Sequence, residues 1–115
     1  MITIEKLRQY GGANVDEGLE RCVNNEALYL RLVGLVPKDE NWDKIRDAAA
    51  EGDIGKIFEY AHVLTGAMGN LSLTKLYEKA SEITELSRAK KDADYVGLVN
   101  ELLGLRDELT EAMGE

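Results

Sequence analysis

The single histidine of this chain, His62, is the residue whose position most suggests chemistry, because it lies in the middle of a predicted amphipathic helix. Each helical residue advances about 100° around the axis, which places the neighbours of the imidazole. On this wheel the apolar core stripe consists of Ile54, Ile57, Ala61, Leu64, Met68 and Leu71. His62 falls about 130° from the middle of that stripe. The three glycines within about 40° of His62 are Gly55, Gly66 and Gly69. The spacing therefore predicts an exposed imidazole on a part of the helix with little side-chain bulk.

An imidazole exposed to water is largely neutral at cell pH, so one ring nitrogen of His62 is free to act as a nucleophile. The glycines need an explanation, because each one in a helix interior costs about 0.5–1 kcal/mol relative to alanine. Two explanations are open at this point. The glycines either let another helix pack closely against this one, or they let the surface of a partner protein reach the histidine.

No other catalytic arrangement accompanies this histidine in the sequence. One histidine and one cysteine, Cys22, provide too few ligands for a zinc site, and a lone cysteine forms no internal disulfide. There is no glycine-rich Walker loop, and no spacing suggests a Ser/His/Asp arrangement. If His62 accepts a phosphoryl group, we therefore expect one protein to deliver the group and another to take it.

The charge of the chain argues against two classes of partner. A net charge of -8 at pH 7 repels nucleic acids and anionic membranes. No apolar run approaches the roughly 18 residues that a membrane span needs, and the N-terminus lacks the pattern of a signal peptide. We expect one soluble, cytoplasmic domain over residues 1–115, with no nucleic-acid or membrane partner.

The residue usage predicts helices throughout, since the chain has one proline and no sustained alternation of period two. The predicted helix caps are Thr3, Asn14, Asn24 or Asn25, Asn41, Asp53 and Ser72. The last helix is predicted to turn Tyr95, Leu98, Leu102, Leu105 and Leu109 inward. The last three helices, each expected to be about 18 to 22 residues long with short connections, should be antiparallel neighbours. The predicted fold is an all-α, antiparallel up-and-down four-helix bundle with extra short N-terminal helices.

One segment resembles the phosphorylation motif of histidine-containing phosphotransfer (HPt) domains: Ala61-His62-Val63-Leu64-Thr65-Gly66-Ala67-Met68-Gly69-Asn70-Leu71. That family has an alanine–histidine pair, an apolar residue two positions after the histidine, and then usually a lysine and a glycine, with small residues following. Three other segments are also similar to the family: Asp16–Arg21, Asn25–Tyr29 and Gly52-Asp53. The resemblance covers roughly residues 14 to 110.

The resemblance implies a helical bundle that relays phosphoryl groups in a two-component phosphorelay. His62 would accept the group from the aspartate of one receiver domain, form a phosphohistidine and pass the group to another. The implied partners are response-regulator receiver domains and a hybrid sensor kinase. The receiver would bring the Mg²⁺, so this chain would need no metal or cofactor and would have no kinase or phosphatase activity of its own. The residues implied to support the phosphohistidine are Thr65, Gly66, Gly69 and Lys75. Those implied to dock the partner are Gly55, Phe58, Glu59 and Asn70.

Two positions depart from the pattern of the family. Thr65 stands three residues after the histidine, where the family usually has a lysine whose charge would stabilise the phosphoryl group. Ser72 stands ten residues after the histidine, where glycine is common. Lys75 and Lys79 on the following helix are our candidates to supply the missing charge.

Because Thr65 stands where the family usually has a lysine, two functions other than phosphotransfer stay open. Without the lysine, the bundle would be a binding module that docks a receiver domain and titrates it, with little phosphate transferred. A third interpretation is a plain helical scaffold in which the glycines form a packing seam. Burial of His62 under another helix would favour the scaffold, because phosphotransfer requires an exposed imidazole.

Overall fold

The computed structural model describes residues 2–114, and most of them are helical. The helices are α1 (Ile4–Tyr10), α2 (Val15–Arg21), α3 (Glu26–Leu35), the 3-10 helix η1 (Val36–Lys38), α4 (Asn41–Glu51), α5 (Ile54–Asn70), α6 (Thr74–Arg88) and α7 (Tyr95–Met113). No strand occurs among the described residues, so the all-α prediction is confirmed. Within the same residues, no helix is both long and apolar enough to cross a membrane.

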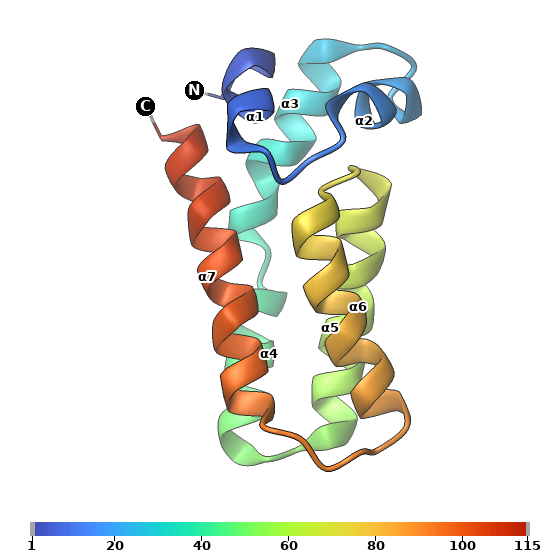
Figure 1. Ribbon diagram of the computed structural model, residues 1–115, viewed down its shortest axis with the longest axis vertical. Coiled ribbons are helices and arrows are strands. Elements are labelled where there is room, and N and C mark those ends of the chain that lie inside the picture. Colours follow the sequence, from blue (N-terminus) through green and yellow to red (C-terminus); the bar gives the residue numbers. More distant parts are fainter. Residues whose placement is uncertain (1, 115) are drawn as a thin grey trace.

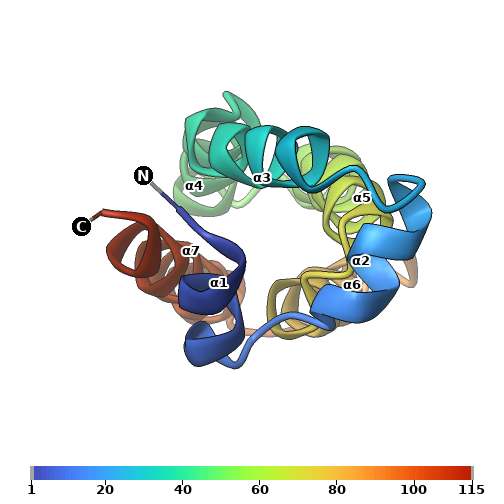
Figure 2. The same ribbon diagram turned by 90° about the horizontal axis from the view of Figure 1, so that it is seen from above.

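Helices α4 to α7 form a ring in which α4 packs against α5, α5 against α6, α6 against α7 and α7 against α4. Figure 1 shows these helices along the long axis of the molecule, with α3 leading down into α4. The short helices α1 and α2 lie across one end of the ring, as the view from above shows (Figure 2). This arrangement fits the predicted helical bundle with short N-terminal helices.

Two of the last three helices are shorter than predicted. Helix α7 has 19 residues, whereas α5 has 17 and α6 has 15. Both are shorter than the predicted range of about 18 to 22 residues.

The core stripe predicted for α5 is confirmed. The fully buried residues of this helix are Ile57, Ala61, Leu64 and Met68. Leu71, directly after the helix, is buried too, and Ile54 at its start is half-buried. His62 is exposed, as its position on the wheel predicts. Burial of the stripe therefore fixes which side of α5 presents the imidazole to solvent.

Four of the predicted caps form hydrogen bonds. The side-chain oxygens of Thr3, Asn14, Asn25 and Asp53 accept from the backbone N–H groups of Lys6, Glu17, Leu28 and Lys56, respectively. The predicted cap Asn41 is wrong, because this residue is already the first residue of α4. Oδ1 of Asp39 accepts from both the backbone and the side-chain N–H groups of Asn41 at 2.8 Å. The carboxylate two residues earlier therefore takes the place of the predicted cap.

The predicted cap Ser72 is also wrong, because this residue lies in the turn before α6. Its φ of 54° is left-handed, and its hydroxyl donates to Oε1 of Glu17 at 2.6 Å. The carbonyl of Gly12 accepts instead at the start of α6, from the N–H of Lys75 at 3.1 Å and from the hydroxyl of Thr74 at 3.3 Å. The N-terminal segment therefore supplies the cap that the sequence predicts at Ser72.

Two further hydrogen bonds hold the turn between α5 and α6 to the N-terminal segment. The N–H of Asn14 donates to the carbonyl of Ser72 at 2.8 Å. The buried hydroxyl of Tyr29 donates to the carbonyl of Leu71 at 2.9 Å. Helix α2 is thereby fixed beside the C-terminal end of α5, the helix that carries His62.

Candidate functional site

The imidazole of His62 stands on the exposed face of α5. Its ring stacks on Phe58, one turn earlier, with centroids 5.6 Å apart and planes 18° from parallel. The guanidinium of Arg88, from the end of α6, lies over the same Phe58 ring at 5.2 Å. No group within residues 2–114 hydrogen-bonds to the imidazole, so both ring nitrogens are available to a reactant. Burial of His62 under another helix would have favoured a plain helical scaffold, and His62 is exposed instead.

The three glycines of α5 differ in what surrounds them. A Cβ built at Gly66 meets nothing within 4 Å. At Gly55 the added atom meets only Oδ1 of Asp53, at 3.6 Å, which is an ordinary contact. At Gly69 it lies 3.2 Å from the ring of Tyr77 on α6. Of the two explanations left open by the sequence, clearance for a partner fits Gly55 and Gly66, and close helix packing fits Gly69.

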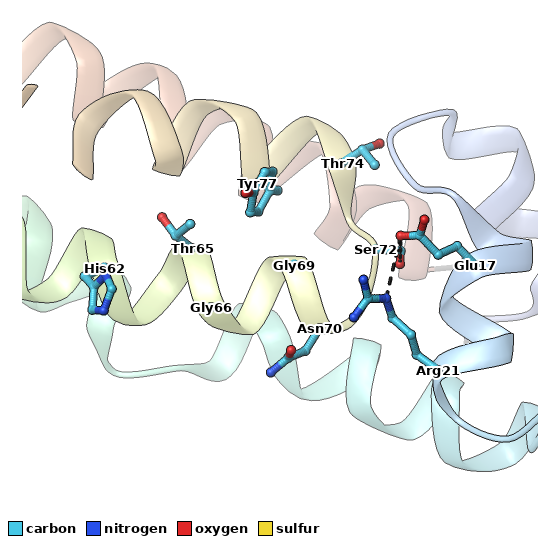
Figure 3. A pocket seen from close by; sticks show the side chains of 10 residues that line it. All are labelled: Glu17, Arg21, His62, Thr65, Gly66, Gly69, Asn70, Ser72, Thr74 and Tyr77. Carbon is cyan, nitrogen blue, oxygen red and sulfur yellow. Dashed lines mark hydrogen bonds and ion pairs between the residues drawn. The ribbon is translucent and has the colours of Figure 1, made fainter. Parts of the chain in front are cut away.

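An open groove of about 550 Å³ follows this face of α5 from His62 to helix α2. The residues that line it are Glu17, Arg21, His62, Thr65, Gly66, Gly69, Asn70, Ser72, Thr74 and Tyr77. Figure 3 shows His62 at one end of the groove, with Arg21 and Glu17 at the other end. The groove therefore joins the histidine to a helix that is far from it in the sequence.

Thr65 turns its hydroxyl into the seam between α5 and α6. Its Oγ1 donates to the carbonyl of Ala61 at 2.8 Å and lies 3.0 Å from Oγ1 of Thr84. A threonine hydroxyl has one proton to donate, and here that proton is already engaged. Thr65 lines the groove, but it has no spare donor for a group on His62.

The structure places Lys75 and Lys79 on the side of α6 that faces α7. Nζ of Lys75 pairs with Glu108 at 3.2 Å, and Nζ of Lys79 pairs with Glu101 at 2.7 Å. The hydrogen bond to Glu101 raises the pKa of Lys79 most, and the hydrogen bond to Glu82 on α6 raises it further. Neither lysine lines the groove, so the structure does not bring the two candidate charges to His62.

The predicted docking residues lie on α5, the helix that also carries the histidine. Gly55, Glu59 and Asn70 are exposed, and Phe58 is half-buried under the ring stack. Asn70 lines the groove as well. The structure therefore keeps these four residues on the helix of His62, although Asn70 lies two turns away from it.

The sequence does not reveal the part of the site that other helices contribute. Arg88 and Tyr77 of α6 lie against α5, and Glu17 and Arg21 of α2 line the groove. No motif marks these residues, because their positions depend on how the helices pack.

Among the described residues, no three His, Cys, Asp or Glu side chains form a group that could hold a metal ion.

Comparison with known proteins identifies the family of this chain. No curated protein and no solved structure matches this chain. A model of the Hpt domain family matches residues 39–114, which include α4 to α7 and the whole of the helix that carries His62. Hpt domains take part in phosphotransfer in two-component signalling and interact with receiver domains. The match spans more than half of the chain, and this chain therefore belongs to the Hpt domain family.

Proposed function

We propose that this chain relays a phosphoryl group between the aspartates of receiver domains, through a phosphohistidine at His62. The observation that carries the proposal is the exposed imidazole, which accepts no internal hydrogen bond from the described residues. Open space at Gly55 and Gly66 supports it, because a partner can approach the ring without meeting side chains at those positions. We also propose that α4 to α7 form an antiparallel up-and-down bundle. Packing within this bundle holds α5, the helix that carries His62, in a fixed position.

The transfer step needs only one reactive group from this chain. The unprotonated ring nitrogen of His62 attacks the phosphorus of the aspartyl phosphate, and an N–P bond forms. The bond between phosphorus and the aspartate oxygen breaks, and the carboxylate leaves with the electron pair. The second ring nitrogen keeps its proton, so the phosphorylated ring carries a positive charge next to the phosphoryl oxygens. The reverse sequence of steps delivers the group to the aspartate of a second receiver.

Arg88 is the cation that we assign to the phosphohistidine in place of the missing lysine. It contacts the Phe58 ring on which His62 stacks, and its side chain is about half exposed (54%). Its ion pair with Glu85 is long, at 3.4 Å, and an exposed pair of this kind contributes only about 0–1 kcal/mol. The guanidinium can therefore leave Glu85 at little cost and donate to phosphoryl oxygens.

The partners in this proposal supply everything else that the reaction needs. A receiver domain holds the Mg²⁺, and a hybrid sensor kinase feeds the relay from ATP. This chain then requires no cofactor and catalyses neither phosphorylation by ATP nor phosphatase chemistry. Receiver domains and the catalytic parts of sensor kinases work in the cytoplasm, and the proposal places this chain there as one domain.

A second function, docking without transfer, is favoured by one observation. The hydroxyl of Thr65 is engaged in the α5–α6 seam, and no described cation touches the imidazole directly. A protein with a slow phosphohistidine step would bind a receiver domain and hold it away from its kinase. Such a binding module would need the same exposed face of α5.

The experiment that separates the two functions starts from receiver domains labelled with radioactive phosphate on aspartate. Each is incubated with the wild-type chain and with His62→Gln, and the complexes are measured in parallel by calorimetry. Acid-labile, base-stable label on the wild-type chain that is absent from His62→Gln supports the relay. Binding without label supports the titrating module. Neither binding nor label with any receiver contradicts both functions.

A further inference from the structure

The groove at His62 ends at a positive charge that the proposed transfer chemistry does not use. Arg21 on α2 lines the groove together with Asn70, at the far end of the glycine-lined face of α5. Eight residues separate His62 from Asn70, which corresponds to about 12 Å along a helix. A phosphoryl group on the imidazole is therefore out of reach of Arg21, but a protein docked over the groove covers both residues.

The guanidinium of Arg21 is only loosely held within the chain. Its Nε lies 3.7 Å from Oε1 of Glu17, which is beyond hydrogen-bond distance, and about half of each side chain is exposed. Glu17 in contrast is fixed, because the hydroxyl of Ser72 donates to the same oxygen at 2.6 Å. No described residue accepts a hydrogen bond from Arg21. Its planar set of donors is thus available to an external carboxylate.

Arg21 is a positive charge in a chain whose net charge disfavours acidic partners. The chain carries a net charge of -8, which opposes the approach of any acidic protein. Of the residues that line the groove, all of them described, Arg21 alone has a permanent positive charge. The Mg²⁺-binding carboxylates of a receiver domain must approach His62. Arg21 lies at the other end of the groove, so it binds a different carboxylate on the docking face of the receiver. A local cation on this groove offsets the repulsion and fixes the orientation of the docked receiver.

We propose that Arg21 is a docking residue that binds a carboxylate on the receiver domain and sets its register over His62. This inference rests on the proposed phosphotransfer function and extends it to helix α2, which lies outside the segment that the family model matches. Helix α2 can hold this position because the turn before α6 is hydrogen-bonded to it and to its neighbours. Arg21 contributes to binding and orientation and takes no part in the transfer step.

The test compares Arg21→Glu with Arg31→Glu, which makes the same change in net charge at an exposed position of α3 outside the groove. Arg21→Gln, which adds no negative charge beside Glu17, serves as a second variant in case the first one perturbs α2. The assay measures initial rates of phosphoryl transfer from a labelled receiver over a range of receiver concentrations. Phosphoramidate, a small donor that needs no docking surface, measures the reactivity of His62 separately. Circular dichroism reports the fold of each variant.

We expect Arg21→Glu to raise the KM for the phosphorylated receiver by about tenfold or more, and Arg21→Gln to raise it by less, because rim charges act on association. The rate at saturating receiver and the labelling by phosphoramidate should stay at wild-type values. Added salt should slow the wild-type chain more than Arg21→Gln.

Equal KM values for Arg21→Glu and Arg31→Glu, with normal transfer by the wild-type chain, overturn the docking role and leave the relay intact. A fall in the saturating rate or in phosphoramidate labelling, with KM unchanged, also overturns it, because Arg21 would then act on the chemistry or the fold. Absence of transfer from every receiver to the wild-type chain overturns the relay and this inference together.

Discussion

The hydroxyl oxygens of Thr65 and Thr84 lie 3.0 Å apart in the seam between α5 and α6. Each oxygen also lies 2.8 Å from the carbonyl four residues earlier in its own helix, so the two hydroxyl protons are shared among three contacts. The position where the family usually has a lysine is therefore used here to join two helices. Among the described residues, the cation in contact with the ring stack of His62 is Arg88, from the adjacent helix.

Thr65→Lys should make the transfer faster. Thr65 is only half-buried and lines the groove, so a lysine there can extend its ammonium group towards the phosphoryl group. The matched control is Thr65→Val, which removes the hydroxyl and adds no charge. Both variants should lose about 1 kcal/mol of stability with the hydroxyl bonds, as measured by urea unfolding. Transfer by Thr65→Val should stay within about twofold of wild type, because the hydroxyl serves the seam. A large loss of transfer in Thr65→Val would assign the hydroxyl to the reaction after all.

Arg88→Ala should slow the transfer at saturating receiver by about tenfold, which corresponds to about 1.4 kcal/mol of lost transition-state stabilisation. Its half-exposed side chain makes one long ion pair and lies over the ring of Phe58, so the variant should lose no more than about 1 kcal/mol of stability. Lys75→Ala and Lys79→Ala are the controls, because these lysines pair with acidic residues of α7. The measurement is the rate of phosphoryl transfer by each variant in single-turnover mixing experiments. If the lysine variants are slow and Arg88→Ala is not, the assignment of the cation is wrong.

Gly66→Ala should stabilise the fold and impair the transfer. The added methyl meets nothing within 4 Å, so the helix gains about 0.5–1 kcal/mol. The same methyl projects into the groove and narrows the approach to His62. Gly104→Ala on α7 is a matched control, since that glycine is also exposed with open space around it. Thermal unfolding should show similar gains for both variants, and only Gly66→Ala should raise the KM for a phosphorylated receiver. Equal transfer by the two variants would return Gly66 to a purely structural role.

Stability should fall as the pH rises above about 10. Burial raises the pKa of Tyr29 to about 12, and it does the same for Tyr10. Since an unfolded tyrosine loses its proton near pH 10, the stabilisation is complete below pH 10 and is lost between about pH 10 and 12. Urea unfolding at a series of pH values measures this slope. A stability that is constant from pH 8 to pH 11 would contradict the burial of these hydroxyls.

Two variants distinguish the contributions of the Tyr29 and Tyr10 hydroxyls to stability at neutral pH. Tyr29→Phe should cost about 1 kcal/mol, because the carbonyl of Leu71 loses its partner. Tyr10→Phe should be neutral or stabilising, because the hydroxyl of Tyr10 is buried without a hydrogen-bond partner among the described residues. Both variants should show a smaller loss of stability at alkaline pH than the wild-type chain. The same unfolding series provides the measurement.

The sequence predicts the face of α5 well, because local periodicity determines it. The stripe around Leu64 is buried and His62 is exposed, as the wheel requires. The caps at Thr3 and Asp53 are equally local, since each involves a side chain and an N–H group three residues later. The family follows from the motif around His62 and is confirmed by the match over residues 39–114.

The parts that the sequence does not predict depend on contacts between distant segments. Ser72 is a plausible cap by residue type, yet its hydroxyl pairs with Glu17 in another helix. Lys75 and Arg88 are both cations of α6, and only the packing of that helix decides which of them lies near His62. Gly66 and Gly69 look alike in the sequence, and the ring of Tyr77 is what distinguishes them.

The central claim is tested most directly by the stoichiometry and fate of phosphate on His62. The wild-type chain, Gly104→Ala and His62→Gln are each mixed with a labelled receiver domain, separated from it, and then mixed with a second, unlabelled receiver. We predict that the wild-type chain and Gly104→Ala each take up acid-labile label approaching one phosphoryl group per chain. This label should then pass to the aspartate of the second receiver. His62→Gln should take up no label. Label that persists in His62→Gln, or that never leaves the wild-type chain, would contradict a relay through this histidine.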